Sequence, residues 1–326
     1  EISNSSFDAI GNVIDQTVEV YVGEKLSRKT VIKNLDISNS GDAGLQKITT
    51  YSTDATGALI EGEISYQEIT NRKFDSSHNV LNQQIFTYNN ATSSKVLLDV
   101  QEVRNISFDS RGNVTESRIA TFADLAKTQL LDIKVIKNES LDSQGNAGKT
   151  TILKYRSGSV DGDTINYSDF IDATIITTSS FDLRGNATTQ VVTKYSDESI
   201  TTLTETQTIT NSGFDFHDRV STSTVITHDG KGVFVDKQVI SYSGYDVYGN
   251  VTDETIARFD SKDVLIDYKE ITNTYADPIA QRRGNATHTT INRYSSATTL
   301  DSTTRIERQE ISNSSFDAIG NVIDQT

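Results

Sequence analysis

The chain opens with the stretch EISNSSFDAIGNVIDQT, Glu1 to Thr17, and the same seventeen letters return as Glu310 to Thr326. Inside this stretch lies the motif Phe7-Asp8-Ala9-Ile10-Gly11-Asn12. Close copies of the motif begin at Phe74, Phe108, Leu141, Phe181, Tyr245 and Phe316, a degraded copy begins at Phe214, and irregular copies lie at 37–42 and 275–285. Such a repeat predicts stacked copies of one supersecondary unit in place of a single large core.

The repeat has two periods. Positions equivalent to Gly11 recur about every 34 residues, and Gly320 lies 309 residues after Gly11. We therefore predict one continuous repeat array over residues 1–326, and we expect the chain to be a segment of something longer. The predicted units are approximately 2–31, 32–68, 69–102, 103–135, 136–175, 176–208, 209–239, 240–270 and 271–310, with 311–326 starting the next 309-residue super-repeat.

The Asp-x-x-Gly core of the motif is typical of a tight turn between two antiparallel strands. Asp favours the first position of a type I turn, and Gly supplies the positive φ that follows it. If Asp8 faces Asn12, then Phe7 faces Val13 and Ile2 faces Val18, so that apolar side chains meet across the hairpin. The predicted structural turn glycines are Gly11, Gly41, Gly112, Gly145, Gly185, Gly249, Gly284 and Gly320.

These features predict an all-β fold: a repetitive antiparallel β-hairpin strip, solenoid-like or helically coiled, of about nine units of ~34 residues. Alternation along the strands places Val100 and Phe122 on the core face and Val103 on the opposite, mostly polar face. The connections between hairpins vary in length, which is typical of surface loops. Examples are the segments 52–67 and 156–171.

Composition limits the partners. The net charge is −15 and the pI about 4.7, so phosphate backbones are repelled and nucleic acid is not an expected partner. The chain contains neither Cys nor Met, which removes the main oxidation-prone side chains and favours an extracellular location. Because no apolar run approaches ~18 residues, we expect no membrane span in this segment.

The motif resembles that of the YD-repeat (Rhs-type) family of secreted β-hairpin repeat proteins. Tyr245-Asp246-Val247-Tyr248-Gly249-Asn250-Val251 fits its pattern of Tyr-Asp-x-x-Gly-Arg/Asn and an aliphatic residue, and Phe7 to Val13 fits with Phe in place of Tyr. The resemblance implies strips of β-hairpins that coil into shells or rods outside cells, some enclosing toxins and others serving adhesion. The longer spacing in this chain favours an open or helical strip over a closed shell.

The sequence predicts no catalytic residue and no cofactor-binding residue, and therefore no enzyme. The four histidines are scattered, and we expect them to occupy surface or turn positions. The hard ion Ca²⁺ takes oxygen ligands, so the only metal candidates are the turn aspartates Asp8, Asp75, Asp109, Asp142, Asp182, Asp215 and Asp246. The alternative is that each carboxylate bonds the backbone of its own turn.

Two further polar rows accompany the turns. A second acidic row is expected to be solvated edge charge that opposes sheet aggregation; it comprises Asp99, Asp132, Asp172, Asp236 and Asp267. A row of asparagines either forms a side-chain ladder or helps the turns; it comprises Asn4, Asn34, Asn71, Asn105, Asn138, Asn211 and Asn273.

Three functions remain as hypotheses. The first is a structural segment of a very long secreted protein that forms an extracellular fibre, sheath or stalk, whose partners are neighbouring repeats or other copies of the same chain. The second is an adhesin or binding module whose variable loops face a partner such as a cell-surface glycan. The third is a YD-repeat shell that encloses a toxin.

Overall fold

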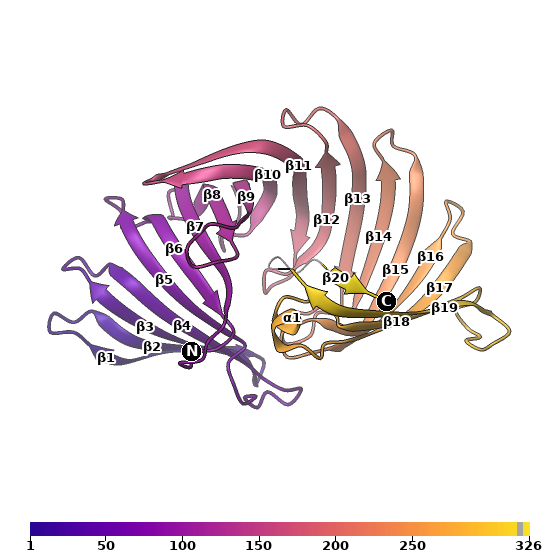
Figure 1. Ribbon diagram of the computed structural model, residues 1–326, viewed down its shortest axis with the longest axis horizontal. Coiled ribbons are helices and arrows are strands. Elements are labelled where there is room, and N and C mark those ends of the chain that lie inside the picture. The colour runs from indigo at the N-terminus through magenta and orange to yellow at the C-terminus, as the bar shows by residue number, and fades with distance from the viewer. Residues whose placement is uncertain (318–321) are drawn as a thin grey trace. The chain divides into compact units, whose positions relative to one another are not determined.

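The computed structural model describes residues 1–317 and 322–326, and its contacts divide the chain into two compact units. Unit 1 comprises Glu1–Asn138 and Ile152–Ile171, and unit 2 comprises Glu139–Thr151 and Asp172–Thr326. The all-β prediction is confirmed, because the described residues form a 20-stranded antiparallel sheet in which successive strands pair with one another (Figure 1).

The strands of unit 1 follow one another in chain order. They are β1 (Ile2–Phe7), β2 (Val13–Val22), β3 (Lys25–Ile37), β4 (Ala43–Ser52), β5 (Ser65–Phe74), β6 (Val80–Tyr88), β7 (Leu97–Phe108), β8 (Val114–Phe122) and most of β9 (Leu130–Leu141). The outer parts of β10 (Ala147–Asp161) and β11 (Thr164–Phe181) also belong to this unit.

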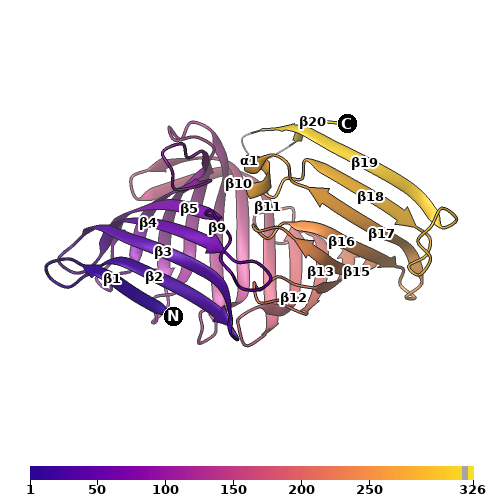
Figure 2. The ribbon, with the colours of Figure 1, turned by 90° about the horizontal axis from the view of Figure 1, so that it is seen from below.

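Unit 2 continues the same pattern with one short helix. Its strands include β12 (Ala187–Tyr195), β13 (Leu203–Ser212), β14 (Thr222–Asp229), β15 (Phe234–Tyr245), β16 (Val251–Phe259), β17 (Leu265–Thr274), β18 (His288–Tyr294), β19 (Arg305–Phe316) and β20 (Val322–Gln325), and its helix is α1 (Pro278–Arg282). Figure 2 shows β16 to β19 side by side in chain order.

The predicted hairpin register is confirmed in the hairpins on which it was based. The two predicted pairs are present, because Phe7 faces Val13 and Ile2 faces Val18. The same register places Ile69 opposite Ile85, Val103 opposite Ile119 and Val100 opposite Phe122. An irregularity interrupts these ladders just before the turn, for example between Asn105 and Phe108. Two compensating shifts restore the original register at the turn itself, so the motif residues still face one another.

Unit 1 contains a dense apolar cluster in the middle of its sheet. Val100, Ala120 and Ile133 are fully buried, and Phe122 and Tyr155 are nearly so. The face that carries Val100 also carries Glu102 and Arg104, which are 0% and 2% exposed. The predicted core face is therefore apolar at one end and charged, yet buried, further along.

The segment 156–171, expected to be a variable loop, is instead the end of a long hairpin, so this expectation is wrong. Strands β10 and β11 run to Asp161 and from Thr164, and Ile165 at the hairpin end is fully buried in the apolar cluster of unit 1. Only glycine fits at position 158, because a Cβ there would lie 2.1 Å from the carbonyl oxygen of Asn166. Apolar side chains within the segment explain why it packs on the sheet.

The irregular repeat copy at 275–285 contains helix α1. Asp277 caps the helix by accepting hydrogen bonds from the backbone N–H groups of Ile279 and Ala280, at 2.9 and 2.7 Å. Pro278, the only proline in the chain, follows the cap, where its missing N–H costs no helical hydrogen bond. Ala280 is buried, so the five-residue insertion is a packed turn of helix that leaves the β17–β18 pairing intact.

Candidate functional site

The repeated turns form the most regular polar feature of the molecule. In the first turn the backbone N–H of Asp8 donates to the carbonyl of Asn12 at 2.9 Å, and the N–H of Gly11 donates to the carbonyl of Asp8 at 3.2 Å. One carboxylate oxygen of Asp8 accepts from the N–H groups of Ile10 and Asn12, and the other accepts from the Asn12 side chain. The same set of bonds recurs around Asp75, Asp109, Asp142, Asp182 and Asp246. At Asp215 the side chain of Arg219 takes the place of the asparagine.

At Asp75 and Asp142 these bonds favour the charged form of the carboxylate. The side chain and backbone of Asn79 donate to Asp75 and keep the pKa of Asp75 below its ordinary value, and Asn146 does the same for the pKa of Asp142. The oxygens proposed as Ca²⁺ ligands are thus engaged by their own turns. Among the described residues, no group of three or more His, Asp or Glu side chains is placed to hold a metal ion.

The glycine of the motif occupies a left-handed backbone conformation. The φ angles are +95° at Gly11, +91° at Gly41, +84° at Gly112, +88° at Gly145, +89° at Gly185, +86° at Gly249 and +75° at Gly284. Gly320 lies outside the described residues. In two altered copies, His78 and Asp218 take this position with φ of +65° and +62°, so the turn tolerates a side chain at some cost in strain.

Neighbouring turns are close enough to touch. A Cβ on Gly112 would lie 2.8 Å from the side-chain oxygen of Asn79, the last residue of the preceding turn. The corresponding distance is 3.2 Å from Gly41 to Asn12 and 3.1 Å from Gly185 to Asn146. The missing side chain of glycine therefore has a second role, which is to let successive turns stack.

The asparagine row joins each hairpin to the one before it, which neither sequence-based alternative described. The ladder between β6 and β7 ends at the pair Asn82–Arg104, so the carbonyl of Val80 lies beyond the last pair. Asn105, the residue after Arg104, donates its side-chain N–H to that carbonyl at 2.8 Å. Equivalent bonds join Asn34 to Val13, Asn71 to Ala43, Asn138 to Val114, Asn211 to Ala187, Asn273 to Val251 and Asn313 to Ala286.

Each of these asparagines adds one rung to the ladder between hairpins by means of its side chain. In five of them the side-chain oxygen also accepts from the facing strand, as when Gln83 donates to Asn71 at 2.8 Å. A carbonyl that would otherwise lack a partner at the end of the ladder is thereby satisfied.

The turns at the other ends of the strands form the same kind of hydrogen bonds. The connections that begin at Asp54, Asp124, Asp197, Asp229 and Asp260 all contain an Asp whose carbonyl accepts from the N–H three residues later. Sequence analysis missed them because the fourth residue varies, being Gly57, Lys127, Ile200, Gly232 and Asp263, all with positive φ. At Asp124, Asp197, Asp229 and Asp260 the signal available in the sequence was an Asp five or six residues before the next strand.

A charged cluster lies beside the end of the long hairpin in unit 1. The buried carboxylate of Glu102 lies 2.7 Å from Arg72 Nη1, 2.7 Å from Lys127 Nζ and 3.1 Å from Arg104 Nη2. Arg104 also donates to the carbonyl of Gly162 at 2.8 Å, which ties the hairpin end to the sheet. Burial alone would raise the pKa of Glu102, but the hydrogen bonds from Arg72 and Lys127 bring it below its ordinary value.

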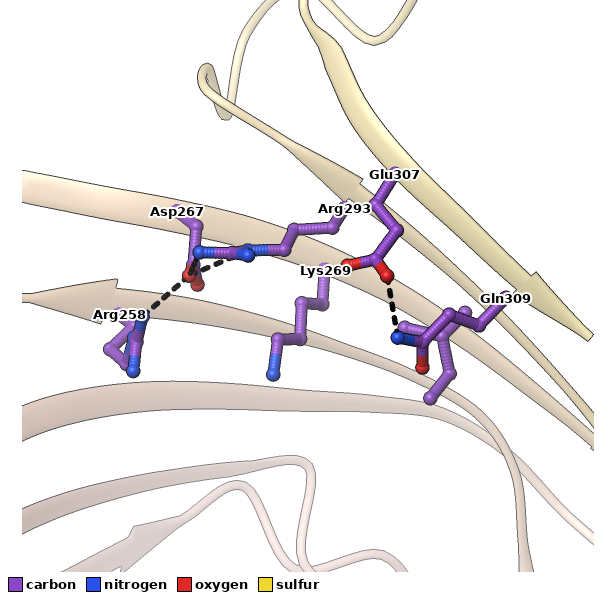
Figure 3. A pocket seen from close by; sticks show the side chains of 7 residues that line it. Arg258, Asp267, Lys269, Arg293, Glu307 and Gln309 are labelled. Atoms are coloured by element: carbon purple, nitrogen blue, oxygen red, sulfur yellow. Dashed lines mark hydrogen bonds and ion pairs between the residues drawn. The ribbon is translucent and has the colours of Figure 1, made fainter. Parts of the chain in front are cut away.

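A second cluster lies on the sheet of unit 2 (Figure 3). Asp267, which is fully buried, lies between Arg258 and Arg293 at 2.7 and 2.8 Å. Lys269 and Glu307 line the same hollow, which has a volume of about 280 Å³. The ion pairs join β16, β17 and β18, and Glu307 lies on the neighbouring strand β19.

The acidic row was expected to be solvated edge charge, and this expectation is wrong. Asp267 and Asp236 are buried, and none of the five aspartates is exposed. Cations lie beside two of these aspartates: Lys134 of the same strand and Lys154 of β10 each lie 3.5 Å from Asp132, and arginines on both neighbouring strands flank Asp267. The row therefore lies within the sheet, where Asp132 and Asp267 form ion pairs with neighbouring strands.

Three of the four histidines contact side chains of neighbouring turns or strands. His78 lies 2.9 Å from Asp42 in the preceding turn, His228 packs against the ring of Phe234, and His288 lies 3.1 Å from Ser312.

No helix among the described residues is long and apolar enough to cross a membrane.

Comparisons with known proteins give only distant likenesses. No protein-family model matches the chain, and no curated protein matches it. Among solved structures, TcdB2-TccC3-Cdc42 is similar at 10% identity with a TM-score of 0.19, and TcdB2-TccC3 at 11% identity with a TM-score of 0.16. The matches cover 98% and 96% of this chain, which spans only 23% and 22% of those chains. Likenesses this slight establish neither a family nor a function.

Proposed function

We propose that this chain is a structural segment of a very long secreted protein that forms an extracellular fibre, sheath or stalk. One observation carries the proposal: strand β19, which contains the repeat of the opening strand, pairs with β18 in the regular antiparallel manner. The last repeat of one 309-residue period thus pairs with the first hairpin of the next period. The sheet can therefore be extended by adding periods.

The contacts between hairpins support a mechanical role. Backbone ladders join successive hairpins, most of the hairpins also form the side-chain bond of an asparagine, and several have a turn that stacks on its neighbour. Because these contacts recur along the strip, load is shared among many equivalent bonds. The role that we propose is therefore structural and not catalytic. The absence of Cys and Met supports an oxidising, extracellular location.

The proposal is tested with chains of one, two and four 309-residue periods, imaged by negative-stain electron microscopy. A fibre segment gives particles whose contour length grows in proportion to the number of periods. Compact hollow particles of constant shape would contradict the proposal and favour a shell.

Any coding sequence that follows Thr326 provides a second test. Further 309-residue copies are expected for a fibre. A distinct toxic domain would favour the shell, and a lectin-like domain together with glycan binding would favour an adhesin.

A further inference from the structure

The hollow on the sheet of unit 2 is built by side chains that the strand register places on one face. Arg258 faces Asp267 across the ladder between β16 and β17. Lys269 faces Arg293 across the next ladder, and Glu307 of β19 faces Arg293 from its other side. Because residues two positions apart in a strand share a face, Asp267 and Lys269 bring all five side chains to the same face. The hollow therefore lies wholly within unit 2.

Asp267 fixes two guanidinium groups in the hollow through only one of its oxygens. Its Oδ2 atom accepts from Arg258 Nη2 at 2.7 Å and from Arg293 Nε at 2.9 Å. Its Oδ1 atom is buried and has no partner among the described residues. Since buried acceptors are nearly always hydrogen-bonded in proteins, this end of the hollow calls for a hydrogen-bond donor.

Lys269 brings a positive charge that no carboxylate of the hollow neutralises. It lines the hollow, and its side chain has neither an ion pair nor a hydrogen bond within the described part of the chain (Figure 3). In the charged cluster of unit 1, by contrast, Lys127 lies 2.7 Å from the buried Glu102. The hollow has three cations and two carboxylates in its lining, although the chain as a whole has a net charge of −15. The excess positive charge favours an anionic ligand at this one place.

The β19 side of the hollow has groups suited to hydroxyls. Gln309 Nε2 donates to Glu307 Oε1 at 2.7 Å, and the other carboxylate oxygen of Glu307 has no donor among the residues that the structure describes. Both side chains are exposed. Glu307 repels a second negative group on a ligand, whereas it accepts a hydrogen bond from a hydroxyl group. The lining therefore matches a ligand that has one anionic group and several hydroxyls.

We propose that this hollow binds a single acidic sugar unit, a hydroxylated ring that carries one carboxylate. The carboxylate lies against Lys269 and against Arg293 Nη1, which the ion pair with Asp267 leaves free. The hydroxyls donate to Glu307 and, directly or through a water molecule, to Asp267 Oδ1. The volume of about 280 Å³ is at the lower limit of ligand pockets, which suits one ring. The inference does not depend on the fibre, because a single chain contains the whole site.

Inorganic anions match only part of this arrangement. Phosphate or sulfate would accept from Lys269 and Arg293, but each carries up to two negative charges into a hollow that also contains Glu307. Neither supplies the hydroxyl donors that Asp267 and Glu307 call for. The two arginines are already held in place by Asp267, so little order is lost when the ligand binds.

An NMR titration of the full chain with glucuronate tests the proposal. We expect amide shifts in β17, β18 and β19 that saturate with a Kd of about 1 mM, as is usual for so small a ligand. Lys269→Gln removes the free ammonium group without breaking a hydrogen bond, and it should weaken binding at least about tenfold. Lys262→Gln is the matched control. Lys262 is exposed in the turn before β17 and does not line the hollow, so the same loss of charge should leave the Kd unchanged.

Three further probes separate the groups of the ligand. Glucose lacks the carboxylate, and acetate and inorganic phosphate lack the sugar hydroxyls, so each should bind more weakly than glucuronate. The preference for glucuronate over acetate should shrink in Glu307→Ala, which removes the acceptor for a hydroxyl.

Four outcomes would overturn the proposal. Glucuronate that shifts no amide of β17 to β19 would show that the hollow has no such ligand, and equal Kd values for Lys269→Gln and the unchanged chain would show that Lys269 does not bind the carboxylate. Equal binding of acetate or phosphate and glucuronate would reduce the site to an adventitious ion only. An unchanged preference in Glu307→Ala would refute the assignment of the hydroxyls.

Discussion

Replacement of Gly112 by alanine should destabilise unit 1 for two separable reasons. The first is backbone strain: at a φ of +84° an L-residue costs about 1–2 kcal/mol. The second is crowding, because the new Cβ would lie 2.8 Å from the side-chain oxygen of Asn79. Displacement of Asn79 weakens its 2.9 Å hydrogen bond to Asp75, which adds about 1 kcal/mol. The expected total loss is therefore about 2–3 kcal/mol.

Gly249 provides the matched control. Its φ of +86° is almost the same, but a Cβ there would meet nothing within 4 Å, so Gly249→Ala should cost only the strain of about 1–2 kcal/mol. Local free energies of opening, measured by native-state hydrogen exchange at each turn, compare the two variants directly. In addition, Asn79→Ala should cost less in the Gly112→Ala background than in the wild type. Equal losses at the two glycines, together with additive effects of Asn79→Ala, would refute the idea that stacked turns restrict this position to glycine.

Three other predictions follow from the contacts within the sheet. Asn105→Ala leaves a backbone carbonyl without its partner and should lower local stability by about 1–3 kcal/mol in hydrogen exchange of β6 and β7, whereas Asn4→Ala, which breaks no such bond, should have almost no effect; equal effects would contradict the role of the asparagine row. Glu102→Gln leaves three cations without a buried counter-charge and should cost about 3–5 kcal/mol in denaturant unfolding of the chain, against at most about 1 kcal/mol for the exposed Asp163→Asn; a small loss for both would show that the cluster is not a source of stability. The lowered pKa of Asp75 means that its turn contributes stability above about pH 4, which is lost as the pH falls through the folded-state pKa; acid titration of stability should show this loss in the wild type and less of it in Asp75→Asn.

Local pattern was sufficient to predict the hairpins. A type I turn with a left-handed fourth residue leaves few choices of chain direction, and apolar residues at equal distances on either side of the turn determine the register. For this reason Ile2 was correctly placed opposite Val18. The turn glycine was also predictable from the sequence, because the positive φ of this turn position is enough to favour glycine. Its second role, as the place where the preceding Asn79 comes close to Gly112, required neighbouring hairpins in space.

Contacts between hairpins were not predictable from the same pattern. Sequence reasoning noticed that Asn105 recurs but could not find its acceptor, because Val80 becomes its neighbour only after the register between β6 and β7 is known. The same limit made Asp267 look like solvated charge. Its two arginine partners come from adjacent strands of two different hairpins.

The sequence by itself therefore determined the repeating unit, the position of its turn and the pairing within each hairpin, because these depend on residues close together in the chain and on backbone geometry. Only the tertiary structure decided which side chains join one hairpin to the next. It buried Glu102 among three cations and folded the end of the long β10–β11 hairpin onto the sheet of unit 1. These contacts join residues tens of positions apart, and the free energy of burying a charge or an apolar side chain depends on which strands become neighbours.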